Sequence, residues 1–181
     1  MQKPHVIAAV LAGAVACGVA PAAAQVQASP DPVGDALRYG LPLAAAALSL
    51  YHRDGEGALQ LGTSFLVAQG TTEILKHTID SPRPDGTGYG FPSGHTSAVF
   101  SAAGFVHRRY GLGEAWPFYA LATVTAYERV HHDHHTTAQV VGGAVVGLGS
   151  AFLFTKPLPD GGVVGVSLRG GGPWVSYART W

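Results

Sequence analysis

Five apolar segments follow one another through the middle of this 181-residue chain, separated by short polar or Pro/Gly-rich breaks. Their lengths and apolar content predict helices over residues 35–52, 58–77, 94–108, 115–129 and 137–154. Short breaks between helices favour an up-and-down arrangement of neighbours. We therefore predict an all-α fold, in which residues 35–156 form a single helical bundle of five core helices.

The low charge of the chain narrows the kind of bundle. Only 12% of the residues are charged, against about 25% in an average soluble domain, while 47% are hydrophobic and 25 are glycine. This composition is typical of small-residue helix packing, in a membrane or in a tight bundle. A net charge of +0 argues against a nucleic-acid partner, and the lone Cys17 excludes an internal disulfide framework.

The N-terminus has the form of a targeting segment. Lys3 and His5 precede an apolar run over residues 6–20, and Ala22-Ala23-Ala24 offers a small-residue cleavage site. We predict that residues 1–24 are a signal peptide, with an uncleaved first membrane helix as the alternative. Lipidation at Cys17 is disfavoured because no large apolar residue lies three positions before it. Residues 25–34 are polar and contain proline, so they are predicted to be a linker.

The C-terminal residues 157–181 form a Gly-rich tail. Two alternating pieces, residues 163–169 and 174–181, are joined by Gly170-Gly171-Gly172-Pro173. Alternation on both sides of a glycine-rich break predicts a short β-hairpin.

Charge placement favours a bundle that spans a membrane. A span needs about 20 mostly apolar residues, and residues 137–154 come nearest to this. If residue 35 starts outside, Arg53, residues 107–109 and Lys156 all fall on the cytoplasmic side, as the positive-inside rule requires. We predict an inner-membrane protein whose opposite, periplasmic end carries the loops around residues 76–95 and 129–135. A soluble periplasmic bundle is the alternative.

The stretch Pro92-Ser93-Gly94-His95 is predicted to begin a helix. Proline cannot continue a helix, Ser93 is a good N-cap, and an apolar run follows. The first amides of a helix are unpaired and favour an anion, and His95 can titrate near neutral pH. These features indicate an anion site beside an acid–base group, although an ordinary capped helix with an exposed histidine would have the same sequence.

Two further clusters fall at the same end of the predicted bundle. Lys76 is followed seven residues later by Arg83, and Arg129 is followed six residues later by His135. Phosphoryl transfer needs positioned cations and amides to stabilise the charge on the phosphoryl oxygens. It can also use one histidine as nucleophile and a second as proton donor. No metal is needed if lysine and arginine neutralise the charge.

The three clusters resemble the three signature motifs of the type 2 phosphatidic acid phosphatase and vanadium haloperoxidase superfamily. The motifs cover roughly residues 76–143, and the order of helices extends the resemblance to residues 35–154. It implies a helical bundle with the active site at one end. It implies that phosphate is bound by Lys76, Arg83, Arg129, the Ser93 hydroxyl and the Gly94 amide. His135 would be the nucleophile and His95 the general acid, with no cofactor and with vanadate as an inhibitor.

The chain departs from the usual motifs at three places. Glu128 stands where the family usually has serine, and only residues 85–91 separate Pro84 from Pro92. Gln139 stands where the family usually has an aspartate that orients the nucleophile, and an amide accepts the same N–H without supplying charge. However, the pattern from His135 to Val140 is similar to that of the dolichyl-diphosphatase branch, which makes polyprenyl diphosphates candidate substrates.

The sequence thus predicts a metal-independent phosphatase that hydrolyses a lipid phosphate or polyprenyl diphosphate through a phosphohistidine. One alternative is a vanadium-dependent haloperoxidase, which the small size of the chain disfavours. The other is a catalytically weak envelope protein that binds metal through the run His131-His132-Asp133-His134-His135.

Overall fold

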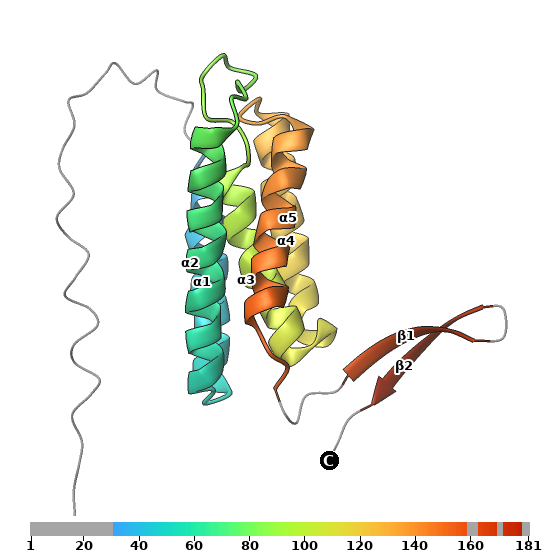
Figure 1. Cartoon of the computed structure of the whole chain (residues 1–181). Helices are drawn as coiled ribbons and strands as arrows, with labels where there is room; N and C mark the ends of the chain where they lie inside the picture. The colour runs from blue at the N-terminus through green and yellow to red at the C-terminus, as the bar shows by residue number, and fades with distance from the viewer. Residues whose placement is uncertain (1–30, 159–162, 170–171, 179–181) are drawn as a thin grey trace, which may run out of the picture.

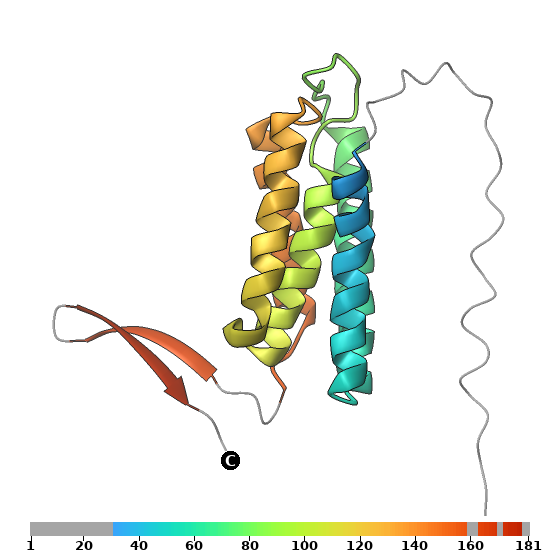
Figure 2. The ribbon, with the colours of Figure 1, turned by 180° about the vertical axis from the view of Figure 1, so that it is seen from behind.

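The computed structural model describes residues 31–158, 163–169 and 172–178. Within these ranges, five helices run alternately up and down (Figures 1 and 2). They are α1 (Pro32–Tyr51), α2 (Gly55–Thr78), α3 (Gly94–Tyr110), α4 (Leu112–His131) and α5 (Thr137–Phe154). The predicted all-α bundle is therefore confirmed. The predicted signal peptide, Cys17 and the first part of the linker lie outside the described residues.

Helix α3 is the central element of the bundle. It packs against each of the other four helices, and most of its residues are buried. Val99, Phe105 and Val106 have no exposed surface and form the core together with small residues on either side of them. The apolar run after Ser93 therefore leads straight into the middle of the fold.

Glycines on α5 allow that helix to approach α3 closely. A β-carbon at Gly147 would lie 2.4 Å from the carbonyl oxygen of Ser97, and one at Gly143 would lie 2.5 Å from that of Ser93. Neither position has room for a side chain. The two helices therefore pack backbone to backbone, which is the small-residue packing that the composition predicts.

Helix α1 begins three residues earlier than the sequence predicts. Asp31 caps the helix by accepting a hydrogen bond from the Gly34 amide over 2.8 Å, and Pro32 occupies the first turn, where its missing N–H costs nothing. Residues 32–34 thus belong to the bundle and not to the predicted linker. Asp31 itself is buried, so the polar, proline-containing composition of this stretch concealed a helix start.

The remaining boundaries differ from the predictions by three residues or fewer. Asp54 caps α2 at Gly57, which moves the start of that helix to Gly55. Helix α5 has the predicted bounds. The C-terminal hairpin consists of β1 (Val163–Arg169) and β2 (Gly172–Ala178), paired antiparallel. The second strand begins two residues before its predicted start at residue 174.

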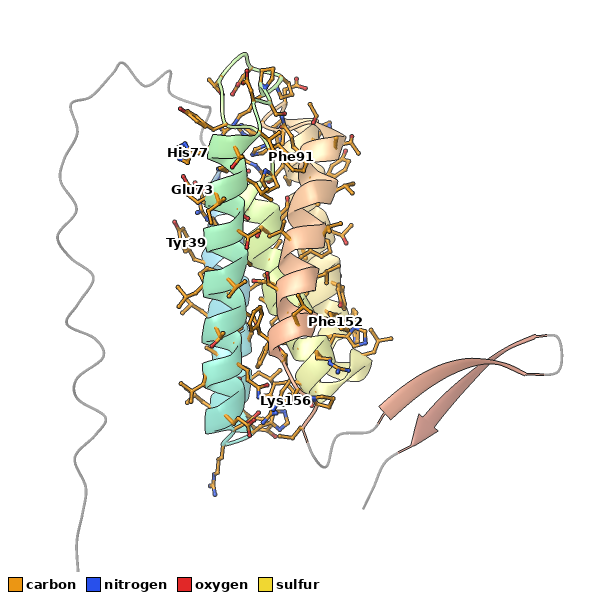
Figure 3. The ribbon with its side chains drawn as sticks, viewed as in Figure 1. Tyr39, Glu73, His77, Phe91, Phe152 and Lys156 are labelled. Carbon is orange, nitrogen blue, oxygen red and sulfur yellow. The ribbon has the colours of Figure 1, made fainter. Side chains whose placement is uncertain are left out.

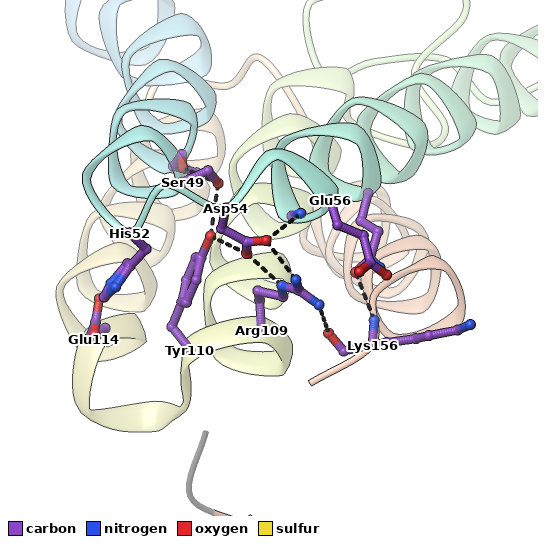
Figure 4. A network of polar contacts seen from close by, with 11 residues as sticks. Ser49, His52, Asp54, Glu56, Arg109, Tyr110, Glu114 and Lys156 are labelled. Carbon is purple, nitrogen blue, oxygen red and sulfur yellow. Dashed lines mark hydrogen bonds and ion pairs between the residues drawn. The ribbon is translucent and has the colours of Figure 1, made fainter. Parts of the chain in front are cut away.

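A buried ion pair closes one end of the bundle (Figure 4). Arg109 at the end of α3 donates two hydrogen bonds of 2.6 Å to the two carboxylate oxygens of Asp54, and a third to the carbonyl of Lys156 over 3.0 Å. Tyr110 also donates to Asp54, over 2.9 Å. The bond from Arg109 is the main reason why the pKa of Asp54 is lowered to about 2. The network joins the turn before α2, the end of α3 and the segment after α5.

Arg109→Met is expected to lower the free energy of unfolding by about 3–5 kcal/mol, because it leaves a buried carboxylate without its partner. Denaturant unfolding at neutral pH measures the loss. Asp54 has a lowered pKa, so its contribution is complete above its unfolded pKa and is lost as the pH falls through about 2. Arg108→Met is the matched control because Arg108 is exposed. Equal losses in the two variants would contradict the assignment.

The outside of the bundle is apolar. Large apolar side chains point outward from the four helices that surround α3, and we call this set the outer apolar surface. It includes Leu43, Leu50, Leu59, Leu66, Ile74, Trp116, Leu121, Val124, Val141, Val145 and Leu153. Exposed apolar surface of this extent marks contact with a partner or a membrane. Among the described residues, only α5 is long and apolar enough to qualify as a membrane span.

Candidate active site

The predicted site residues gather at the end of the bundle opposite the Arg109 network. There α2 ends, α3 and α5 begin, and the loop over residues 79–93 covers the junction (Figures 1 and 2). Figure 3 shows His77 and Phe91 at this end and Lys156 at the other. The structure brings all eight predicted site residues to this end: Lys76, Arg83, Ser93, Gly94, His95, Arg129, His135 and Gln139.

Three cationic side chains form the centre of the site. A β-carbon at Gly94 would lie 3.7 Å from Lys76 Nζ, so the ammonium group sits beside the first turn of α3. Burial lowers the pKa of Lys76, and the charge of Arg83 lowers it further. The Nε atoms of Arg83 and Arg129 are buried and have no hydrogen-bond partner among the described residues. Buried donors without acceptors are costly, so this cluster favours an anion that accepts from them.

Asp31 holds Arg129 in place. Arg129 donates from Nη1 to Asp31 Oδ2 over 2.8 Å, and both side chains are buried. Burial alone would raise the pKa of Asp31, but the bonds from Gly34 and Arg129 lower it below its ordinary value. The carboxylate therefore stays charged and fixes one side of the guanidinium, while Nε on the other side remains without a partner.

Backbone hydrogen bonds order the loop that carries Arg83. The Arg83 amide donates to the Thr87 carbonyl over 2.7 Å, and the Gly90 amide donates to the Ser81 carbonyl over 2.8 Å. Asp85 accepts from the backbone amide of Thr87 over 2.9 Å. The short spacer between the first two motifs thus forms a closed loop that positions Arg83 over the site.

Gln139 links the predicted nucleophile to this loop. Its Nε2 donates to Ser81 Oγ and to the Pro82 carbonyl, each over 2.9 Å. Its Oε1 lies 3.0 Å from His135 Nδ1 and accepts from the Thr136 amide over 3.1 Å. The carbonyl oxygen of the Gln139 side chain only accepts hydrogen bonds, and its NH2 group only donates them. These contacts therefore fix which way the side-chain amide faces.

The orientation of Gln139 sets the tautomer of His135. Oε1 can only accept, so Nδ1 of His135 must carry the proton, and Nε2 keeps its lone pair. Burial is the main cause that lowers the pKa of His135 to about 3, and the cations Arg83 and Arg129 lower it further. The imidazole is therefore neutral over the physiological range, with a free nitrogen available for attack.

The predicted proton donor has a carboxylate partner. His95 Nε2 lies 2.7 Å from Asp35 Oδ1, across 60 residues of sequence. Burial is the main cause that lowers the pKa of His95 to about 4; Asp35 raises it, and the charges of Arg129 and Arg38 lower it. A bound anion would offset these two cations and raise the pKa of His95 again. His95 is thus suited to gain a proton when a phosphate group enters the site.

Ser93 has the capping role that the sequence predicts. Its Oγ lies 3.5 Å from the Thr96 amide and accepts from Thr96 Oγ1 over 3.0 Å. The residue has no exposed surface. The contacts of the Ser93 hydroxyl and the Gly94 amide with phosphate remain predictions.

Glu128, which stands where the family usually has serine, is paired with a histidine. Its Oε2 lies 2.8 Å from His132 Nε2, one turn further along the chain. Nearby, His131 stacks on Tyr127 at a ring distance of 5.2 Å. Over residues 31–158, no three His, Cys, Asp or Glu side chains are arranged to hold a metal ion. The histidine run therefore has local partners that the sequence did not indicate.

Three residues at the start of α1 were not predicted from the sequence. Asp31 is the N-cap of α1, and Asp35 and Arg38 follow it four and seven residues later, so all three lie along one side of the start of the helix. The first two contact Arg129 and His95. The i, i+4, i+7 spacing of charged residues was the available signal, and the predicted linker hid its first member.

The bundle holds three cations beside two histidines, and among the described residues two of the guanidinium nitrogens are buried without a hydrogen-bond partner. This arrangement is typical of a phosphoryl-transfer type of protein. Comparison with known proteins agrees, because residues 85–160 match the family model described as PAP2 superfamily. The chain is 39% identical over 138 residues to the lipid A 4'-phosphatase of Helicobacter pylori, covering 70% of this chain and 69% of that protein. The chain therefore belongs to the PAP2 superfamily.

Other relatives match over shorter lengths. Identity is 30% over 122 residues with the lipid A 1-phosphatase of Helicobacter pylori, covering 62% of this chain and 64% of that protein. It is 32% over 86 residues with the undecaprenyl-diphosphatase BcrC of Bacillus subtilis, covering 46% and 42%. The crystal structure of Aquifex aeolicus LpxE shares the fold, with a TM-score of 0.52 and 19% identity over 69% of this chain and 87% of that one.

Proposed function

We propose that this PAP2-superfamily hydrolase removes a phosphate group from a lipid phosphate or lipid diphosphate by way of a phosphohistidine on His135. The proposal rests on two buried guanidinium nitrogens, on Arg83 and Arg129, that have no partner within the part of the chain that the structure describes. They belong to a cluster whose charges act on the neutral His135. Such a site attracts a phosphate group and holds it beside a nucleophile.

In the first step, Nε2 of His135 attacks phosphorus with its lone pair. An N–P bond forms while the bond from phosphorus to the leaving oxygen breaks. His95, protonated when the anion enters, gives its proton to that oxygen. Lys76, Arg83 and Arg129 stabilise the charge on the remaining phosphoryl oxygens. The products are a phosphohistidine and a lipid alcohol, or a lipid monophosphate when the substrate is a diphosphate.

In the second step, water hydrolyses the phosphohistidine. The neutral His95 takes one proton from the attacking water, a new O–P bond forms, and the N–P bond to His135 breaks. Inorganic phosphate leaves and both histidines return to their starting states. The hydrogen bond from Nδ1 to Gln139 keeps the same tautomer through the cycle.

Lys76, Arg83 and Arg129 neutralise the charge of the phosphoryl group, which a metal ion does in other phosphatases. Activity is therefore expected to persist in excess EDTA, and vanadate, as a phosphate mimic, is expected to inhibit. Loss of activity in EDTA that zinc or magnesium restores would contradict metal independence.

The outer apolar surface supports a place at a membrane. Its side chains would contact acyl chains, and the site end would lie in the headgroup region, where a lipid phosphate is found. The relatives act, by their names, on lipid A and on undecaprenyl diphosphate. We propose both chemistries as candidates, with the protein in the inner membrane and its site facing the periplasm.

A substrate panel tests the proposal. Purified protein is given phosphatidate, lipid A, undecaprenyl diphosphate and p-nitrophenyl phosphate in detergent micelles, and released phosphate is measured. Vanadate-sensitive release from at least one lipid supports the proposal. Folded protein that releases phosphate from none of them contradicts it, and bromide oxidation with added vanadate would point to the haloperoxidase alternative.

A further inference from the structure

One cationic residue beside the site has no part in the mechanism above. Arg38 lies on the face of α1 that also carries Asp31 and Asp35, three residues beyond the second of these. Those two carboxylates contact Arg129 and His95, over 2.8 and 2.7 Å. This face of α1 therefore borders the site. Arg38 lies about one helical turn after Asp35, the residue that contacts His95.

The side chain of Arg38 starts within two helical turns of the site end of α1. Helical side chains lean toward the N-terminus of their helix, and the N-terminus of α1 is at the site end (Figure 2). The guanidinium carbon lies 5.4 Å from the ring centre of Tyr39, and the residue is half-buried. Over residues 31–158, no carboxylate forms an ion pair with Arg38. Within that part of the chain, the charge of Arg38 is therefore not matched by a carboxylate.

The position of Arg38 on α1, three residues after Asp35, places it toward the proton donor, and its charge effects agree. Its charge lowers the pKa of His95 and of Lys76. For His135, the largest charge effect comes from Arg83 instead. Because Asp35, on the same face of α1, contacts His95, Arg38 lies nearer to the proton donor than to the nucleophile.

In an in-line displacement, the leaving group lies opposite the nucleophile. We propose that Arg38 binds the leaving phosphate of a lipid diphosphate, which makes it a specificity residue for diphosphates over monoesters. This inference rests on the proposed function. When a monoester is cleaved, the leaving group is a neutral alcohol that needs only a proton. When a diphosphate is cleaved, the leaving group is an anionic phosphate ester, whose oxygens match the guanidinium fork.

The test compares two substrates with the same lipid chain, farnesyl diphosphate and farnesyl monophosphate. Arg38→Ala is expected to lower kcat/KM for the diphosphate by about 10- to 100-fold, as expected for one charge-assisted hydrogen bond. The kcat/KM for the monophosphate should change by less than about threefold, since a screened charge that does not touch the transferred phosphate adds little. Arg38→Lys should recover part of the diphosphate rate. Lys156→Ala, which removes one exposed charge at the far end, should leave both rates unchanged.

Equal losses on the two substrates would overturn the assignment, because they would place Arg38 on the transferred phosphate or in the fold. No loss on either substrate would also overturn it. If the unaltered protein hydrolyses neither these substrates nor the lipids above, the proposed function itself fails. Hydrolysis of both substrates by the unaltered protein, with no selective effect of Arg38→Ala, removes only the inference about Arg38.

Discussion

His135→Ala is expected to lower the rate of phosphate release by about 10⁴-fold or more, because it removes the nitrogen that accepts the phosphoryl group. The cations that bind the substrate remain, so the affinity for vanadate should change far less than the rate. Initial-rate measurements on the best lipid of the panel, with vanadate competition, measure both effects.

The neighbouring histidines supply the control for this prediction. His131 lies at the end of α4 with an exposed side chain that stacks on Tyr127. His131→Ala should keep a normal rate, with thermal unfolding close to that of the unaltered protein. A folded His135→Ala variant that keeps more than about a tenth of the activity would remove His135 as the nucleophile.

Gln139→Leu is expected to reduce the rate by about 10⁴-fold, the loss that a wrong histidine tautomer causes in another enzyme class. Leucine keeps much of the volume but removes the acceptor for His135 Nδ1 and the donors to Ser81 and Pro82. The nucleophile and the loop that carries Arg83 then both lose their hydrogen bonds to residue 139. Steady-state kinetics should therefore show a lower kcat together with a higher KM.

Gln139→Glu separates the tautomer role from the loop role. The carboxylate still accepts from Nδ1 but raises the pKa of His135, which is about 3 with glutamine. The nucleophile is the neutral imidazole, so activity is lost as the pH falls through that pKa. The acidic limb of the pH–rate profile should therefore move to higher pH in Gln139→Glu. A uniformly lower rate with an unmoved limb would mean that Gln139 acts only by holding the loop.

The sequence was sufficient to predict the bundle and the inner part of the site. Apolar runs identified all five helices, because each outer helix combines core-facing residues with an apolar exterior. The cluster around Pro92 and Ser93 gave the start of the central helix, since proline and an N-cap serine mark such starts locally. The up-and-down order then brought Lys76, Arg83 and Arg129 to one end.

The supporting contacts could not be predicted because they join distant parts of the chain. Asp31 pairs with Arg129 across 98 residues, and Gln139 reaches Ser81 across 58. No local pattern encodes such pairs. For Gln139 the sequence indicated an uncharged substitute for aspartate, whereas the structure shows an amide that both fixes the histidine and donates to the loop. A carboxylate at this position could not make those two donations.

Transfer of the phosphoryl group to His135 leaves a covalent intermediate, and this intermediate can be detected. The protein is mixed briefly with lipid substrate carrying a labelled terminal phosphate, quenched in alkali to preserve phosphohistidine, and digested for mass spectrometry. A phosphoryl group is expected on the peptide that contains His135, and none on the corresponding peptide of His135→Ala. Label on a different residue, or turnover by folded protein with no label on His135, would mean that His135 is not the nucleophile.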